Sequence, residues 1–193
     1  MRIAIVVFDG VEELDFAGPW EVLKYWAREP AVDAEVLLLA DSQDPVRAAK
    51  DMRLLPDTTW DAAGHIDVLV LPGGRGTCAL VEDTALHQRL RDLAAGGTLM
   101  TSVCTGSLVY AAAGLLRGRP ATTHWSTLDR LVALDPTIEV RPDDRFVDDG
   151  DVITAAGVSA GIDMAMHLVA RLDSTDAARR VKRGIQYDPQ PPV

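Results

Sequence analysis

Short apolar runs alternate with longer segments of helical periodicity along the chain. Continuous runs of this kind are typical of strands buried on both faces of a parallel sheet. They cover residues 3–8, 35–40, 68–71 and 98–103. Apolar residues at helical spacing predict helices over residues 19–27, 84–95, 105–113, 126–134, 159–172 and 176–186. This alternation predicts an α/β fold with a doubly wound, mostly parallel sheet and helices on both faces.

The segments between these elements carry turn and capping signals. Residues 46–60 are irregular, with the pattern of a small hairpin, and residues 146–154 have the pattern of a second hairpin. Asp83 is placed to cap the helix that follows it. The proline-rich tail over 188–193 is expected to be non-helical. No repeat or linker interrupts the sequence, so we expect a single domain over residues 1–193.

Composition and charge narrow the classes of function. Of the 193 residues, 48% are hydrophobic and 25% are charged, the balance of a globular protein with a buried core. The formal net charge of −10 argues against a nucleic-acid partner, because a polyanion is bound by clustered Lys and Arg. The apolar N-terminus ends at Asp9 without a signal-peptide cleavage pattern. No apolar stretch approaches membrane-spanning length, so no membrane partner is expected.

The two cysteines, Cys78 and Cys104, are too few for a disulfide framework and do not have metal-ligand spacing. Free thiols are typical of proteins in a reducing compartment. We therefore expect a cytoplasmic protein in which at least one thiol is available for chemistry.

In a doubly wound sheet, ligands bind beyond the carboxyl ends of the strands, and the segment 102–107 (Ser-Val-Cys-Thr-Gly-Ser) lies at such an end. A buried strand leads directly into Cys104 and a helix begins at once, which is the layout of a nucleophile elbow. Gly106 permits close approach of the backbone. The helix N-terminus favours a thiolate, so we expect the pKa of Cys104 to fall from ~8.5 toward ~4–7. The alternative is a small, buried, inert cysteine.

Two further segments follow predicted strands. The N–H groups of Gly73 and Gly74, after the strand over 68–71, are suited to stabilise negative charge on a substrate, although an ordinary turn has the same pattern. Asp15 follows the first strand, just before the predicted helix over 19–27. It is either a cap or solvated loop acid, or a partly desolvated carboxyl group that acts as general acid or base beside the thiol.

Other polar residues are assigned structural roles. His124 has no identifiable acid partner and is interpreted as a packed histidine, and Cys78 as a packing residue. Asp148 and Asp149 are interpreted as parts of a solvated turn, and so are Asp143 and Asp144. Neither pair is assigned to a Ca²⁺ site, because a Ca²⁺-binding loop needs a stricter ligand pattern. The remaining histidines, His65, His87 and His167, are likewise interpreted as structural.

Six segments together carry a family resemblance: residues 14–19, 71–74, 102–107, 113–118, 121–125 and 160–163. They resemble the ThiJ/PfpI superfamily and, within it, the bacterial isocyanide hydratases, with similarity from Arg2 to Pro192. The resemblance implies a flavodoxin-like fold and a homodimer. It also implies that Cys104 attacks the terminal carbon of an isocyanide, with Asp15 and Thr105 as essential partners.

Two departures from the superfamily pattern qualify this resemblance. PfpI-type peptidases place His directly after the nucleophile, whereas Thr105 occupies that position here, so peptidase and glyoxalase-type activities are not expected. The hydratases also continue beyond the Pro-Pro pair with a further helical tail, whereas this chain ends at Val193. This departure leaves the usual dimer contacts open and does not affect the expected site.

The expected reaction is covalent hydration of a small-molecule isocyanide. Cys104 adds to the isocyanide carbon while Asp15 supplies a proton, and water then releases an N-substituted formamide from the thioimidate. This cycle requires neither a cofactor nor a metal.

Other members of the superfamily provide alternatives that are not hydratases. The segment 121–125 also resembles the ligand domains of AraC-type regulators, but the sequence has no residues for their additional helix-turn-helix domain. A redox-sensing or chaperone role is the remaining alternative.

Overall fold

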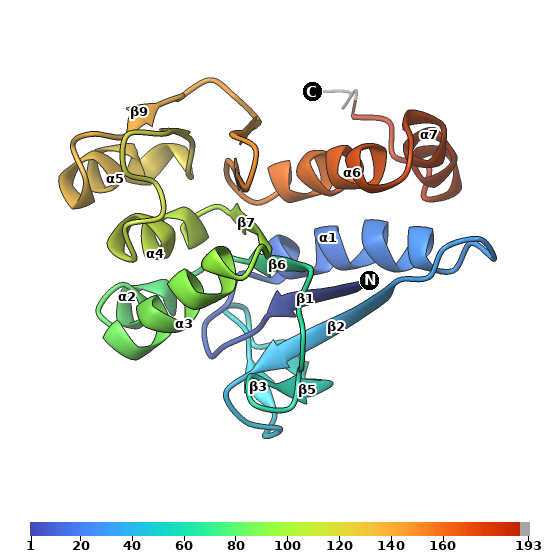
Figure 1. The fold of residues 1–193 in the computed structure, drawn as a ribbon, viewed down its shortest axis with the longest axis horizontal. Coiled ribbons are helices and arrows are strands. Elements are labelled where there is room, and N and C mark those ends of the chain that lie inside the picture. The colour runs from blue at the N-terminus through green and yellow to red at the C-terminus, as the bar shows by residue number, and fades with distance from the viewer. Residues whose placement is uncertain (190–193) are drawn as a thin grey trace.

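A computed structural model describes residues 1–189, and its central element is a seven-stranded sheet with the order β10-β11-β7-β6-β1-β2-β5 (Figure 1). The strands are β1 (Arg2–Val6), β2 (Glu35–Ala40), β5 (Thr58–Thr59), β6 (Val68–Leu71), β7 (Leu99–Val103), β10 (Phe146–Asp148) and β11 (Val152–Ala155). All neighbouring pairs are parallel except β10–β11. The predicted doubly wound, mostly parallel α/β fold is confirmed.

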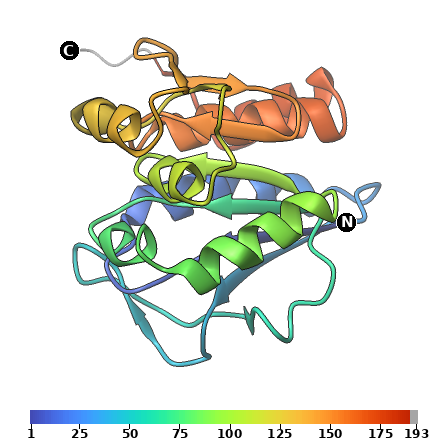
Figure 2. The ribbon, with the colours of Figure 1, turned by 60° about the vertical axis from the view of Figure 1, so that its left-hand side comes forward.

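Helices cover both faces of this sheet (Figure 2). One face carries α1 (Glu13–Ala27), α6 (Ala160–Leu172) and α7 (Thr175–Gly184). The other carries α2 (Thr77–Leu80), α3 (Thr84–Ala95), α4 (Gly106–Ala112) and α5 (Leu128–Leu134). Within residues 1–189, none of the helices has the combination of length and apolar character that crossing a bilayer requires.

Side-chain alternation along the strands explains why their sequences are continuously apolar. Ile3 and Ile5 of β1 pack in the hydrophobic cluster beneath α1 and α6, whereas Ala4 and Val6 pack in the cluster beneath α3 and α4. Successive strand residues point to opposite faces, so a strand covered on both sides needs apolar residues at every position. Parallel pairing of β6 with β1 and with β7 places the carboxyl ends of these three strands side by side.

Several predicted boundaries agree with the structure residue by residue. Strands β2 and β6 and helix α3 have the expected bounds, and the Asp83 side chain accepts a hydrogen bond of 2.9 Å from Leu86 N at the start of α3. Both predicted hairpins form, the smaller one from β3 (Val46–Arg47) and β4 (Arg53–Leu54). Short elements not predicted are α2, β5, β8 (Pro120–Ala121), β9 (Glu139–Val140) and a 3₁₀ turn (Trp125–Thr127). Of the expected non-helical tail, residues 190–193 lie outside the described part.

The start of α1 corrects one prediction. The helix begins at Glu13 rather than Pro19, and Asp15 therefore lies in its first turn instead of a loop. Proline favours the first position of a helix, which made Pro19 the expected start. In the structure Pro19 is inside the helix, and the acidic first turn with Glu13 and Asp15 marks the true N-terminus.

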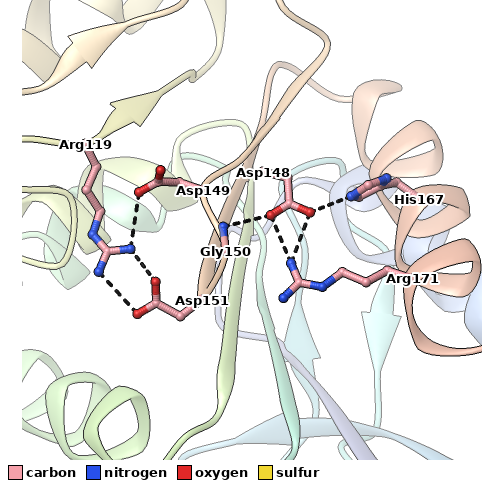
Figure 3. A network of polar contacts seen from close by, with 7 residues as sticks. All are labelled: Arg119, Asp148, Asp149, Gly150, Asp151, His167 and Arg171. Carbon is pink, nitrogen blue, oxygen red and sulfur yellow. Dashed lines mark hydrogen bonds and ion pairs between the residues drawn. The ribbon is translucent and has the colours of Figure 1, made fainter.

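The hairpin at the sheet edge is fixed by ion pairs rather than solvated, which corrects a second prediction. Asp148 of β10 accepts hydrogen bonds from His167 Nε2 (2.6 Å) and Arg171 Nη1 (2.9 Å) of α6 (Figure 3). Arg119 pairs with Asp149 in the turn at 3.3 Å. Burial raises the pKa of Asp148, but these donors outweigh it and hold that pKa below its usual range. The network ties the antiparallel edge strand to the helix layer.

The contact between Gly106 and β6 generates a stability prediction. A Cβ at this position would overlap the Leu71 carbonyl oxygen and lie 3.0 Å from the Pro72 carbonyl oxygen. Because the obstacle is strand backbone, Gly106→Ala should destabilise the protein by about 1–3 kcal/mol. This outweighs the gain of about 1 kcal/mol that alanine normally brings to a helix.

Urea unfolding of Gly106→Ala measures this effect, with Gly96→Ala as the control. Gly96 ends α3 with φ −75°, and a Cβ added there would lie no closer than 3.3 Å to the neighbouring carbonyl oxygens. Its substitution should change stability by no more than about 0.5 kcal/mol. Equal midpoints for the two variants would contradict the close-approach argument.

Candidate active site

Cys104 lies at the turn between β7 and α4, beyond the carboxyl end of the sheet. Its φ of 57° is in the left-handed region, which costs about 1–3 kcal/mol for a residue with a side chain. The Cys104 N–H donates to the carbonyl oxygens of Ala155 (3.0 Å) and Ala156 (3.1 Å). Its carbonyl oxygen accepts hydrogen bonds from Ser107 Oγ (3.1 Å) and Thr123 Oγ1 (2.9 Å). The structure thus has the strand–turn–helix predicted for an elbow, held from both sides.

Asp15 is completely buried in the first turn of α1. Its Oδ2 accepts a hydrogen bond of 2.9 Å from Gly73 N, whereas Oδ1 has no donor in hydrogen-bonding geometry among residues 1–189. Burial raises the pKa of Asp15 to about 7, although the Gly73 N–H lowers it, and the charge of Glu12 raises it further. The expected desolvated carboxyl group is therefore present, and it titrates near neutral pH.

The Cys104 thiol lies beside this carboxyl group, and burial there opposes the lowered pKa expected at the helix N-terminus. Burial, followed by the charge of Asp15, raises the pKa of Cys104 to about 12. The N–H groups of Thr105 and Val158 lower that pKa but do not offset the burial. Helix α4 has only 7 residues, and Cys104 is only 6% exposed, so desolvation outweighs the effect of the helix N-terminus on the pKa.

Gly73 and Gly74 position the catalytic candidates, which corrects the role expected for their N–H groups. Both groups are already engaged, since Gly73 N donates to Asp15 Oδ2 and Gly74 N donates to Thr105 Oγ1, each at 2.9 Å. They are therefore not free to hold an intermediate. A Cβ on Gly73 would lie 2.5 Å from Thr105 N and 2.8 Å from Asp15 Oδ2. Only glycine at 73 lets these two residues come together.

Thr105 and a residue that sequence reasoning missed complete the cluster. Thr105 Oγ1 lies 3.0 Å from the hydroxyl oxygen of Thr77, which is buried at the start of α2. No sequence signal indicated Thr77, because α2 is a four-residue helix without a periodic apolar pattern. The double-glycine turn just before it was the only local indication that its neighbours face the site.

The remaining candidates lie outside this cluster. The half-buried His124 ring packs on Gly157, and its Nδ1 is 2.8 Å from Ser126 Oγ. Cys78 is exposed, so its interpretation as a packing residue is wrong. In residues 1–189, no three His, Cys, Asp or Glu side chains are arranged to hold a metal ion.

Known proteins are similar to this chain in both sequence and structure. The model of the DJ-1/PfpI family matches residues 1–171. Isonitrile hydratase from Pseudomonas putida is 40% identical over 193 residues, which are 100% of this chain and 81% of the relative. A crystal structure of a ThiJ/PfpI family protein from Pseudomonas syringae has a TM-score of 0.88 and 34% identity, covering 100% of this chain and 77% of that one. Drosophila melanogaster DJ-1beta has a TM-score of 0.86 and 26% identity, covering 97% and 98%.

The match to the family model spans most of the chain, and the structural similarity extends over all of it. The predicted superfamily and its flavodoxin-like fold are thereby confirmed. This chain belongs to the DJ-1/PfpI family.

Proposed function

We propose that the protein hydrates isocyanides to N-substituted formamides, with Cys104 as the nucleophile. The observation that carries this proposal is the buried carboxyl group of Asp15, with a pKa raised to about 7, beside a thiol on a strained elbow. Such a pair can both remove and return one proton near neutral pH. The similarity to a protein named isonitrile hydratase supports this choice of substrate.

In the first step the thiol proton passes to the Asp15 carboxylate as the sulfur attacks the terminal carbon of the isocyanide. An S–C bond forms, and Asp15 then gives the same proton to that carbon. The product is a thioimidate, R–N=CH–S–Cys104. The terminal carbon of an isocyanide reacts with thiolates faster than with water, so covalent catalysis replaces one difficult step with two easier ones.

In the second step water adds to the thioimidate carbon, with Asp15 as the base that receives a water proton. Asp15 passes this proton to the nitrogen, which gives the tetrahedral intermediate R–NH–CH(OH)–S–Cys104. The C–S bond then breaks, and the hydroxyl proton moves through Asp15 to the sulfur, which leaves as a thiol. R–NH–CHO leaves, and one water has been added overall. We assign the Thr105 hydroxyl to orient this water or the substrate nitrogen, because it lies in the same cluster as Asp15. The thiol hydrogen ends on the carbon, one water hydrogen on the nitrogen and the other on the regenerated thiol, so the cycle requires neither a metal nor a cofactor.

A redox-sensing role is less consistent with this geometry. Sensor cysteines combine a low pKa with solvent access. The Cys104 thiol is 6% exposed, and burial raises its pKa. A peptidase mechanism lacks the adjacent histidine, because Thr105 follows the nucleophile.

The first test is formamide production. Wild-type protein mixed with a small alkyl isocyanide should yield the matching N-alkyl formamide, detected by mass spectrometry. Cys104→Ala should abolish turnover, because no other group forms the S–C bond. Cys78→Ser is the matched control and should retain full turnover, since that thiol is exposed and outside the cluster. Inactive wild-type protein, or an active Cys104→Ala variant, would rule out the proposal.

The second test concerns Asp15. Asp15→Asn keeps the side-chain volume and an oxygen that accepts the Gly73 N–H, but it removes the transferable proton. Turnover should fall by about 10²-fold or more, the usual scale of general acid–base catalysis. A thermal melt checks folding. A folded Asn variant with turnover close to wild type would remove Asp15 from the mechanism.

The pH dependence gives a third test. At low pH both Asp15 and Cys104 are protonated, and no base is present to accept the thiol proton. As the pH rises through about 7, Asp15 ionises and the pair retains the one proton that the mechanism requires. The value of kcat/KM, measured between about pH 5 and 9, should therefore rise along a single limb centred near the pKa of Asp15. A flat profile, or one that falls across this range, would contradict the assignment.

A further inference from the structure

The Thr77 hydroxyl has one proton and two acceptors. Its oxygen lies 2.7 Å from the Gly74 carbonyl oxygen and 3.0 Å from Thr105 Oγ1. The side chain is 2% exposed, so within this cluster no bulk water competes for the proton. Thr105 Oγ1 also accepts a hydrogen bond of 2.9 Å from Gly74 N. The two hydroxyl groups and the N–H and carbonyl groups of Gly74 therefore form a closed hydrogen-bonding cluster.

This cluster has two arrangements that differ in the direction of the Thr105 proton. If Thr77 donates to the Gly74 carbonyl, Thr105 can donate to Thr77, and its proton is held inside the cluster. If Thr77 donates to Thr105, Thr105 Oγ1 accepts two hydrogen bonds. Inside the cluster its own proton then has only a long contact of 3.4 Å to the Gly74 carbonyl oxygen, so it can turn outward instead. A hydroxyl oxygen has two lone pairs, so the second arrangement uses its full accepting capacity.

We propose that Thr77 is a positioning residue that, by donating to Thr105 Oγ1, directs the Thr105 hydroxyl proton toward the reacting atoms. The inference deepens the proposed function and rests on it, because Thr105 is assigned to water or the substrate nitrogen there. No proton is transferred in this change, since only the two O–H bonds rotate. Thr77 itself does not touch the substrate.

The local fold does not depend on the Thr77 hydroxyl. The Gly74 carbonyl also accepts the Thr77 N–H at 3.1 Å, and this bond survives any substitution at 77 except proline. The Gly74 N–H keeps its bond to Thr105. Removing the Thr77 oxygen therefore leaves no backbone group of this turn without a partner, so its effect should appear in catalysis rather than in folding.

Thr77→Val is the main variant, because it replaces the hydroxyl by a methyl group of similar size. We expect kcat for a small alkyl isocyanide to fall about tenfold, the scale of one neutral hydrogen bond. KM should change by less than about twofold, because the interaction acts after substrate binding. Thr77→Ser should restore most of kcat, since it retains the hydroxyl.

The matched control is Thr98→Val, which makes the same chemical change at a buried threonine outside the site. Thr98 Oγ1 donates to the Ile66 carbonyl at 2.7 Å. This control should leave kcat unchanged. If Thr77→Val melts well below wild type, Thr77→Ser and Thr77→Ala are compared instead. These two variants differ only by the hydroxyl group, so the ratio of their kcat values measures its effect.

A double-mutant cycle with Thr105→Val separates positioning from a structural role. If Thr77 acts only through Thr105, Thr77→Val should have no further effect on kcat in the Thr105→Val background. Product accumulation followed over hours keeps the slow variants measurable. An additive loss, or a Thr77→Val variant with wild-type kcat, would overturn the inference while leaving the proposed function intact. Wild-type protein that yields no formamide would overturn both.

Discussion

The main chain at Cys104 is held from two sides in a left-handed conformation that residues with side chains seldom adopt. On one side its N–H reaches the carbonyl oxygens at the end of β11, and on the other its carbonyl oxygen receives two side-chain hydroxyls. These contacts offset strain of about 1–3 kcal/mol and fix the direction of the thiol. Gly106 approaches the end of β6 closely, and this contact places the Gly73-Gly74 turn that follows β6 next to the Cys104 turn.

Burial decides the chemistry of the pair that this turn creates. A carboxyl group and a thiol that share a water-excluded space both resist ionisation, because a desolvated charge is unfavourable. The main-chain donors near the sulfur oppose this effect without reversing it. The pair therefore holds one proton more firmly than either group would in water. A reaction that adds H and S to the same carbon uses such a shared proton directly.

Much of the fold was predictable from the sequence because its signals are local. Apolar runs predicted β2 and β6 to the residue, and a capping aspartate predicted the start of α3. The predicted start of α1 was wrong because proline is common at the first position of a helix, whereas Pro19 lies inside this one. The short helix α2, and with it Thr77, was missed because four residues carry no periodic pattern. Ion pairs at Asp148 were missed because their partners lie on another element.

By itself, the sequence determined the succession of the longer strands and helices along the chain and the strand-to-helix turn at Cys104. It also placed Asp15 and the double glycine after two predicted strands, but only the structure shows that these strands are neighbours. Each of these follows from side-chain periodicity or backbone preference within a few residues. Only the tertiary structure decided which protons the site holds and which N–H groups remain free. Those properties depend on burial and on hydrogen-bond partners from β1, β6 and β7, which are distant in sequence and meet only when the sheet forms.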